Sequence, residues 1–243
     1  MPPYSLIDPT VAAFVVIPVA LVLVFSLGVG RAWRRTGQSD AAATWAVIAS
    51  LAGGVGWMAL TAATAQSGVL REWDRNPPPF VILMVGVLVV AGGIAFSPLG
   101  RRLAEGLPLW GLVAFQGFRL PLELAMHGMY ERGIMPAQMS YSGRNFDIVT
   151  GITAIAVGGL LAAGRGGRAL VAAWNIVGLL LLTNIVVVAL LSTPRFAFFG
   201  QDRLNVWITY PPFVWLPAVM VASALAGHLV IFRAVRRPAD VTT

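Results

Sequence analysis

Polar and ionisable side chains recur on one face of residues 107–128 and just beyond, in a segment otherwise built from apolar residues, glycine and proline. At 100° per residue, five of them share a helical arc of about 80°. These five are Gln116, Arg119, Glu123, His127 and Tyr130. We expect Arg119 and Glu123, one turn apart, to form an ion pair. The stripe predicts either a structural ion pair that pins the fold or a binding or ion-relay site, where the arginine would clamp a carboxylate or phosphate.

Metal chemistry is a weaker interpretation of the same residues. Glu123 and His127 have the i, i+4 spacing of two metal ligands on one helix face, and Asp147 would be a third ligand. One such spacing also arises by chance. The chain has no cysteine and no lysine, which excludes thiol nucleophiles, thiolate ligands and Schiff bases. We therefore expect no catalytic residue, no metal and no cofactor, and rank a membrane-embedded metalloenzyme below the non-enzymatic alternatives.

The composition places these residues in a membrane. Hydrophobic residues make up 58% of the 243 residues and charged residues 11%, too few charges for a water-soluble surface. Seven apolar stretches are each about long enough for a helix to cross the hydrocarbon core. We predict one all-α domain, residues 1–243, with seven transmembrane helices. They are expected at about 11–30, 41–65, 80–97, 107–128, 146–164, 169–191 and 212–233.

The arginines predict the orientation. Alternate connections collect ten arginines against three acids on one side, whereas the other side has six of each. Because cytoplasmic loops are rich in basic residues, the N-terminus is expected outside and the C-terminus in the cytoplasm. The net charge of +7 is then explained by topology and by contact with anionic lipids on the cytoplasmic side. We do not expect nucleic acid as a partner.

Polar residues of other segments are expected at the same depth as the stripe. Asp147 begins the predicted helix 146–164, Asn145 is a candidate N-cap, and Asn184 lies in the outer half of 169–191. The long outer loops 129–145 and 192–211 are expected to roof this layer. Pro121 should kink the fourth helix, because it removes the hydrogen bond to the carbonyl of Gly117. The candidate ligand-binding residues are Gln116, Arg119, Glu123, His127, Tyr130, Asn145, Asp147 and Asn184.

Two stretches carry a resemblance. Residues from Gln116-Gly117-Phe118-Arg119 through Glu123 to Gly143-Arg144-Asn145-Phe146-Asp147 resemble a bacterial family of seven-helix membrane proteins of unassigned function. The tail from Leu216-Pro217-Ala218 to His228-Leu229 is similar to the same family, and the match covers about a quarter of the chain. The resemblance implies the fold and a bacterial inner membrane, but no activity. The topology is also similar to that of rhodopsins, although the last helix has no lysine for retinal.

The favoured functional interpretation is a ligand-binding membrane protein, either a sensor or a transporter. Its pocket would lie in the outer half of the bundle, around 107–128, and would take a small anionic or polar ligand. The main alternative is a structural subunit of a larger membrane complex or homo-oligomer. The third segment, 80–97, has no polar side chain before Ser97 and would then be the contact face, toward lipid or a partner subunit.

Overall fold

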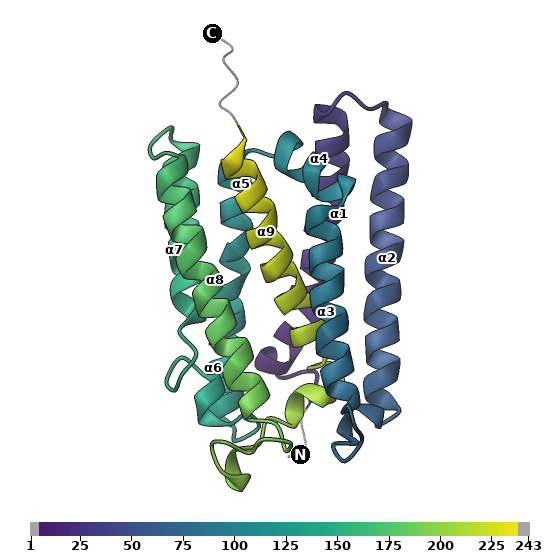
Figure 1. Cartoon of the computed structure of the whole chain (residues 1–243), viewed down its shortest axis with the longest axis vertical. Coiled ribbons are helices and arrows are strands. Elements are labelled where there is room, and N and C mark those ends of the chain that lie inside the picture. The colour runs from purple at the N-terminus through teal and green to yellow at the C-terminus, as the bar shows by residue number, and fades with distance from the viewer. Residues whose placement is uncertain (1–4, 238–243) are drawn as a thin grey trace.

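The computed structural model describes residues 5–237; residues 1–4 and 238–243 of the predicted domain lie outside this range. Between these limits the chain forms helices and turns without a β-strand, so the all-α prediction is confirmed. The long helices run alternately up and down, and α1 begins at the opposite end of the bundle from the end of α9 (Figure 1). The α-helices are α1 (Pro9–Arg35), α2 (Asp40–Gln66), α3 (Pro79–Phe96), α4 (Pro98–Gly106), α5 (Leu109–Phe115), α6 (Arg119–Glu131), α7 (Asp147–Ala162), α8 (Arg168–Leu191) and α9 (Ala222–Arg236).

Five segments are long and apolar enough to cross a membrane. They match five of the predicted spans and comprise Pro9–Arg35, Asp40–Gln66, Pro79–Phe96, Arg168–Leu191 and Leu216–Arg236. The shortest has 18 residues, or about 27 Å at about 1.5 Å per residue, which approaches the thickness of a bilayer core. These segments indicate a multi-pass membrane protein.

The other two predicted spans differ in form. The segment expected at 146–164 is α7, an apolar helix of 16 residues. The segment expected at 107–128 is not continuous, because the 3-10 turn η2 (Gln116–Phe118) separates α5 from α6. Pro121 follows this turn and has no N–H for the carbonyl of Gly117, so the chain tightens where the kink was predicted.

A second irregular turn opens the last span. The π-helical turn η6 (Leu216–Val221) precedes α9 and contains Pro217. Two indole groups hold it against α2: Trp57 donates a hydrogen bond to the carbonyl of Ala218 at 2.8 Å, and Trp215 donates one to the carbonyl of Met58 at 3.0 Å. The irregular turn η2 thus interrupts one helical run, and the irregular turn η6 begins another.

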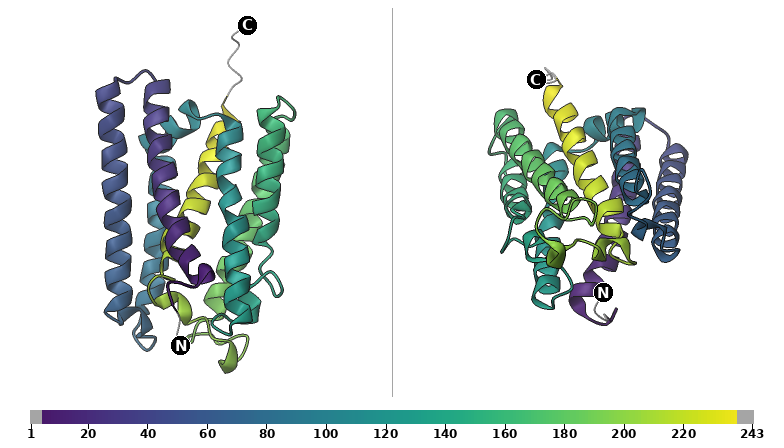
Figure 2. Two further views of the ribbon diagram at one scale, coloured as in Figure 1. Left: turned by 180° about the vertical axis from the view of Figure 1, so that it is seen from behind. Right: turned by 60° about the horizontal axis from the view of Figure 1, so that its bottom comes forward.

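The last helix organises the packing. Helix α9 runs obliquely through the bundle and contacts α3, α4, α5 and α8 (Figures 1 and 2). Helices α1 and α2 pack together on one side, and α7 and α8 pack together on the other. Helix α6 contacts both α1 and α7. The candidate site described below is lined by residues of α6, α7, α8 and η6, among other elements.

The third segment, expected to face lipid or a partner subunit, has a buried face as well as an exposed one. Phe80, Met84 and Val87 of α3 are buried in the bundle, whereas Ile82 and Val85 are exposed. Apolar residues occur all round α3, so the sequence could not distinguish the buried face from the outer one. A further short helix, α4, occupies residues expected to form a linker and packs on α1 and α9.

Candidate functional site

The polar residues of α6 meet the start of α7 at a close helix crossing. Arg119 is the first residue of α6, and Asp147 is the first residue of α7. The crossing depends on Gly151, because a Cβ there would lie 2.4 Å from the backbone nitrogen of Leu120. A side chain at this position would force the two helices apart.

The ion pair of Arg119 is made across this crossing. Its Nη1 lies 3.1 Å from Oδ1 of Asp147, and the two side chains are only 1% and 7% exposed. The hydroxyl of Thr150 donates to the same oxygen at 3.2 Å. The predicted pairing of Arg119 with Glu123 is therefore wrong in its partner. A wheel drawn for one helix cannot include a neighbouring helix, and Asp147 meets the guanidinium directly.

Glu123 has a different partner, Asn145. The side-chain amide of Asn145 donates to Oε2 of Glu123 at 2.7 Å and to the carbonyl of Met139 at 3.1 Å. Its side-chain oxygen accepts the backbone N–H of Asp147 at 3.0 Å. The N-cap position itself is Phe146, one residue later than predicted, but Asn145 still satisfies an amide at the start of α7. Asn145 thus orients both carboxylate-bearing segments.

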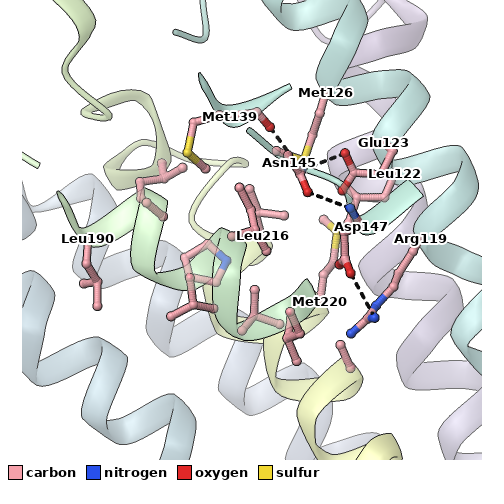
Figure 3. A pocket seen from close by; sticks show the side chains of 18 of the residues that line it. Arg119, Leu122, Glu123, Met126, Met139, Asn145, Asp147, Leu190, Leu216 and Met220 are labelled. Atoms are coloured by element: carbon pink, nitrogen blue, oxygen red, sulfur yellow. Dashed lines mark hydrogen bonds and ion pairs between the residues drawn. The ribbon is translucent and has the colours of Figure 1, made fainter. Parts of the chain in front are cut away.

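A cavity lies beside these carboxylates. Its volume is about 60 Å³, and it is open on one side. Arg119, Glu123, Asn145 and Asp147 gather on one side, and apolar side chains form the remainder (Figure 3). The apolar lining comes from α3, α6, α8, η6 and the outer loops, and includes Phe80, Met84, Phe118, Leu122, Leu182, Ile185, Leu190, Ile208 and Leu216.

The polar atoms of the site differ in their access to the cavity. Glu123 lines the cavity, and its Oε1 accepts no hydrogen bond from any residue between 5 and 237. In contrast, Nε and Nη2 of Arg119 are fully enclosed and have no hydrogen-bond partner within the same range. The cluster of Arg119, Glu123 and Asp147 has a formal charge of zero when Glu123 is protonated and −1 when Glu123 is ionised. The group with a free polar atom that a ligand would meet is therefore the carboxyl group of Glu123.

The loops 129–145 and 192–211 both contribute to the lining. Met139, from the turn η3 (Ala137–Met139), and Ile208, from the turn η5 (Trp207–Thr209), face the cavity. Gln138 joins the two loops through hydrogen bonds to the hydroxyl of Ser192 at 3.0 Å and to the carbonyl of Arg203 at 2.8 Å. The expected roof is therefore present as contacts between these loops.

Four of the eight predicted residues do not line the cavity. Gln116 is buried and donates to the carbonyl of Ala224 at 3.1 Å. His127 stacks on Tyr141 with 4.3 Å between ring centroids, and Tyr130 packs at the edge of the core with its ring 5.8 Å from that of His127. Asn184 is half-buried and donates to a loop carbonyl at 2.8 Å. The stripe therefore divides: its Arg119–Glu123 portion faces the site and its two ends serve other contacts.

Methionines are the residues that the sequence prediction missed. Four of the eight in the chain line the cavity: Met84, Met126, Met139 and Met220. They come from four separate elements, so no motif in the sequence joins them. The methionines themselves were the available signal, because flexible thioether side chains adapt to ligands of different shape.

The three residues proposed as metal ligands, Glu123, His127 and Asp147, face different partners. The Nδ1 of His127 lies 2.9 Å from the hydroxyl of Ser140, and its Nε2 lies 3.5 Å from Glu131. Glu123 and Asp147 face Asn145 and Arg119 instead. No group of three His, Asp or Glu side chains suited to a metal ion exists in the described part of the chain.

No family model, curated protein or solved structure matches this chain. The resemblance to a bacterial seven-helix family therefore stays a prediction. The chemistry of the site has to be argued from its own residues: a buried carboxylate with one free oxygen, held by Asn145 at the wall of an apolar cavity.

Proposed function

We propose that this chain is a ligand-binding protein of a bacterial plasma membrane, which it crosses seven times with its N-terminus outside. The alternating direction of the long helices supports seven crossings, with α7 as one and α5, η2 and α6 together as another (Figure 1). The excess of arginine at one end of the bundle supports the orientation. In this orientation the cavity lies in the outer half.

One observation carries the proposal of binding: a carboxylate with an unpartnered oxygen lines an apolar cavity inside a helix bundle. Glu123 is 2% exposed, and burying an ionisable group within a membrane is costly. Its neighbour Arg119 is already paired with Asp147, so Glu123 is not needed to neutralise the guanidinium. A costly group that adds no ion pair to the fold is expected to serve a ligand.

The irregular helices favour a transporter over a sensor. Transporters commonly build their binding sites from interrupted helices near the middle of the membrane. Here η2 interrupts one span and η6 begins another, and Phe118 of η2 and Leu216 and Met220 of η6 line the same cavity. Interrupted helices also provide hinges for opening the site alternately toward either side.

The orientation can be tested directly, because the chain has no cysteine. We expect Ser142→Cys, in the outer loop before α7, to react with a membrane-impermeant maleimide in intact cells. Gly167→Cys, in the connection between α7 and α8, should react only after the cells are opened. The reverse pattern would contradict the orientation, and reaction of both in intact cells would contradict the crossing by α7.

Access to the cavity can be tested with a small neutral thiol reagent, methyl methanethiosulfonate. Leu216→Cys, on the cavity wall, should react when the reagent is added to intact cells. Val230→Cys, which is 3% exposed in the core between α9 and its neighbours, is the buried control and should react far more slowly. Equal protection of both cysteines would contradict an accessible pocket.

A further inference from the structure

The charge of the cavity wall identifies the class of ligand. Glu123 and Arg119 both line the cavity. The two unpartnered nitrogens of Arg119 are fully enclosed, so Oε1 of Glu123 is the free polar atom that a ligand can meet. An anion would meet the unpaired carboxylate of Glu123 and would not reach the guanidinium. A cation paired with the ionised form of Glu123 would leave the cluster without net charge. Electrostatics therefore favour a cationic ligand over the anion that the arginine alone suggested.

The lining determines which kind of cation fits. A bound Ca²⁺ ion takes six or more oxygen ligands. A bound Mg²⁺ ion keeps several waters in addition to its protein ligands. The cavity supplies carboxylate and amide oxygens on one side only. Its other walls are aliphatic, methionine and phenylalanine side chains, and they include the rings of Phe80 and Phe118. Such walls suit an alkyl group, and aromatic faces also attract ammonium groups.

We propose that the cavity binds a small lipophilic ammonium ion. Its charged nitrogen would bind Oε1 of Glu123, and its apolar part would lie along Met84, Leu182 and Met220. The volume of about 60 Å³ accommodates the ammonium head or several waters, and a longer alkyl group would extend into the opening. This inference rests on the proposed function, because it names the ligand class of the same pocket.

Three matched probes test the ligand class: hexylammonium, hexanoate and hexanol, which share an alkyl chain and differ in charge. The purified protein in a neutral maltoside detergent should melt at a higher temperature with hexylammonium than with hexanol. Hexanoate should add nothing beyond hexanol. In Glu123→Gln the rise in melting temperature caused by hexylammonium should fall to the rise caused by hexanol. This loss corresponds to hexylammonium binding at least about tenfold more weakly than to the unsubstituted protein.

A pair of α8 variants locates the effect in the cavity. Ala189 lines the cavity, so Ala189→Trp should fill it and abolish the response to hexylammonium. Ala173 is an exposed alanine on the same helix, so Ala173→Trp should leave the response unchanged. A response lost in both variants, or in neither, would contradict binding in the cavity.

A second readout does not depend on the folding of a Glu123 variant. In Leu216→Cys with Glu123 retained, the cationic trimethylammonium-ethyl methanethiosulfonate should react faster than the anionic sulfonatoethyl reagent. After normalisation to Gln201→Cys, an exposed position, the preference should be roughly tenfold or more. Stabilisation by hexanoate, or equal normalised rates for the two reagents, would overturn the cation proposal while leaving the pocket intact. Failure of the neutral reagent to reach Cys at 216 would instead refute the pocket itself.

Discussion

Asn145 and Glu123 are joined by a 2.7 Å hydrogen bond that links the start of α7 to the middle of α6. Asn145 donates its second hydrogen bond to the loop carbonyl of Met139 and accepts the first amide of α7. One side chain therefore fixes the carboxylate, the helix that carries Asp147 and the loop over the cavity.

Removing Asn145 should destabilise the fold and free the carboxylate. Asn145→Ala loses three hydrogen bonds, and each buried group left without a partner costs about 1–3 kcal/mol. We expect the free energy of unfolding in detergent, measured by chemical denaturation, to fall by at least about 2 kcal/mol. Asn184→Ala loses a single hydrogen bond at a half-buried position and should change the free energy of unfolding by less than about 1 kcal/mol. Similar losses in the two variants would contradict the role given to Asn145.

The ion pair between Arg119 and Asp147 predicts a compensating double variant. Arg119→Gln and Asp147→Asn should each lower the free energy of unfolding by about 3–5 kcal/mol, because the surviving charge is buried without its partner. The double variant should lose less than the sum of the two single losses. Denaturation of the four proteins gives the coupling energy, and strictly additive losses would contradict a direct pair.

The close crossing of α6 and α7 predicts opposite effects at two glycines of the same helix. Gly151→Ala places a methyl group 2.4 Å from the backbone nitrogen of Leu120, so α7 must move away from α6 and the ion pair should weaken. We expect a loss of at least about 2 kcal/mol in unfolding free energy, as for overpacked cores. Gly159→Ala meets nothing within 4 Å and should be neutral or stabilising by up to about 1 kcal/mol. Tolerance of Gly151→Ala would refute the crossing.

Asp8, at the start of α1, should make the stability of the folded protein depend on pH in the acid range. Asp8 accepts hydrogen bonds from the hydroxyl and the amide of Thr10 and pairs with Arg132 at 2.7 Å. The hydrogen bonds from Thr10, followed by the charge of Arg132, hold the pKa of Asp8 below its ordinary value of 3.8. A lowered pKa in the folded state stabilises the protein above the ordinary pKa and is lost as pH falls through the folded value.

Asp8→Asn keeps an oxygen that can cap the helix but removes this titration. The melting temperature of the unsubstituted protein should therefore exceed that of Asp8→Asn at pH 6, and the difference should shrink as pH falls below about 4. Melting both proteins in one detergent across this range measures the effect. A difference that stays constant with pH would contradict the contribution of the Asp8 carboxylate.

The sequence predicted the helical segments more readily than the side-chain pairings between them. The apolar stretches identified five long helical spans, and Pro121 marked the interruption of a sixth, because both depend on local chemistry. Arg119, Glu123, Asn145 and Asp147 were identified because polar residues inside a membrane are conspicuous. Their pairing was wrong because Asp147 reaches Arg119 from another helix. The methionines and the buried face of α3 were missed because apolar residues have the same character on lipid-facing and cavity-facing surfaces.

The free energy of unfolding of Glu123→Gln tests the central claim, that Glu123 is retained for a ligand rather than for folding. Glutamine has nearly the same shape and keeps an oxygen to accept the hydrogen bond from Asn145. Arg119 keeps Asp147 as its partner. We predict that Glu123→Gln changes the unfolding free energy by less than about 1 kcal/mol, or raises it, as is common for residues kept for function. A loss of about 3–5 kcal/mol, similar to that of Asp147→Asn, would show that Glu123 is a structural ion-pair residue and would contradict the account.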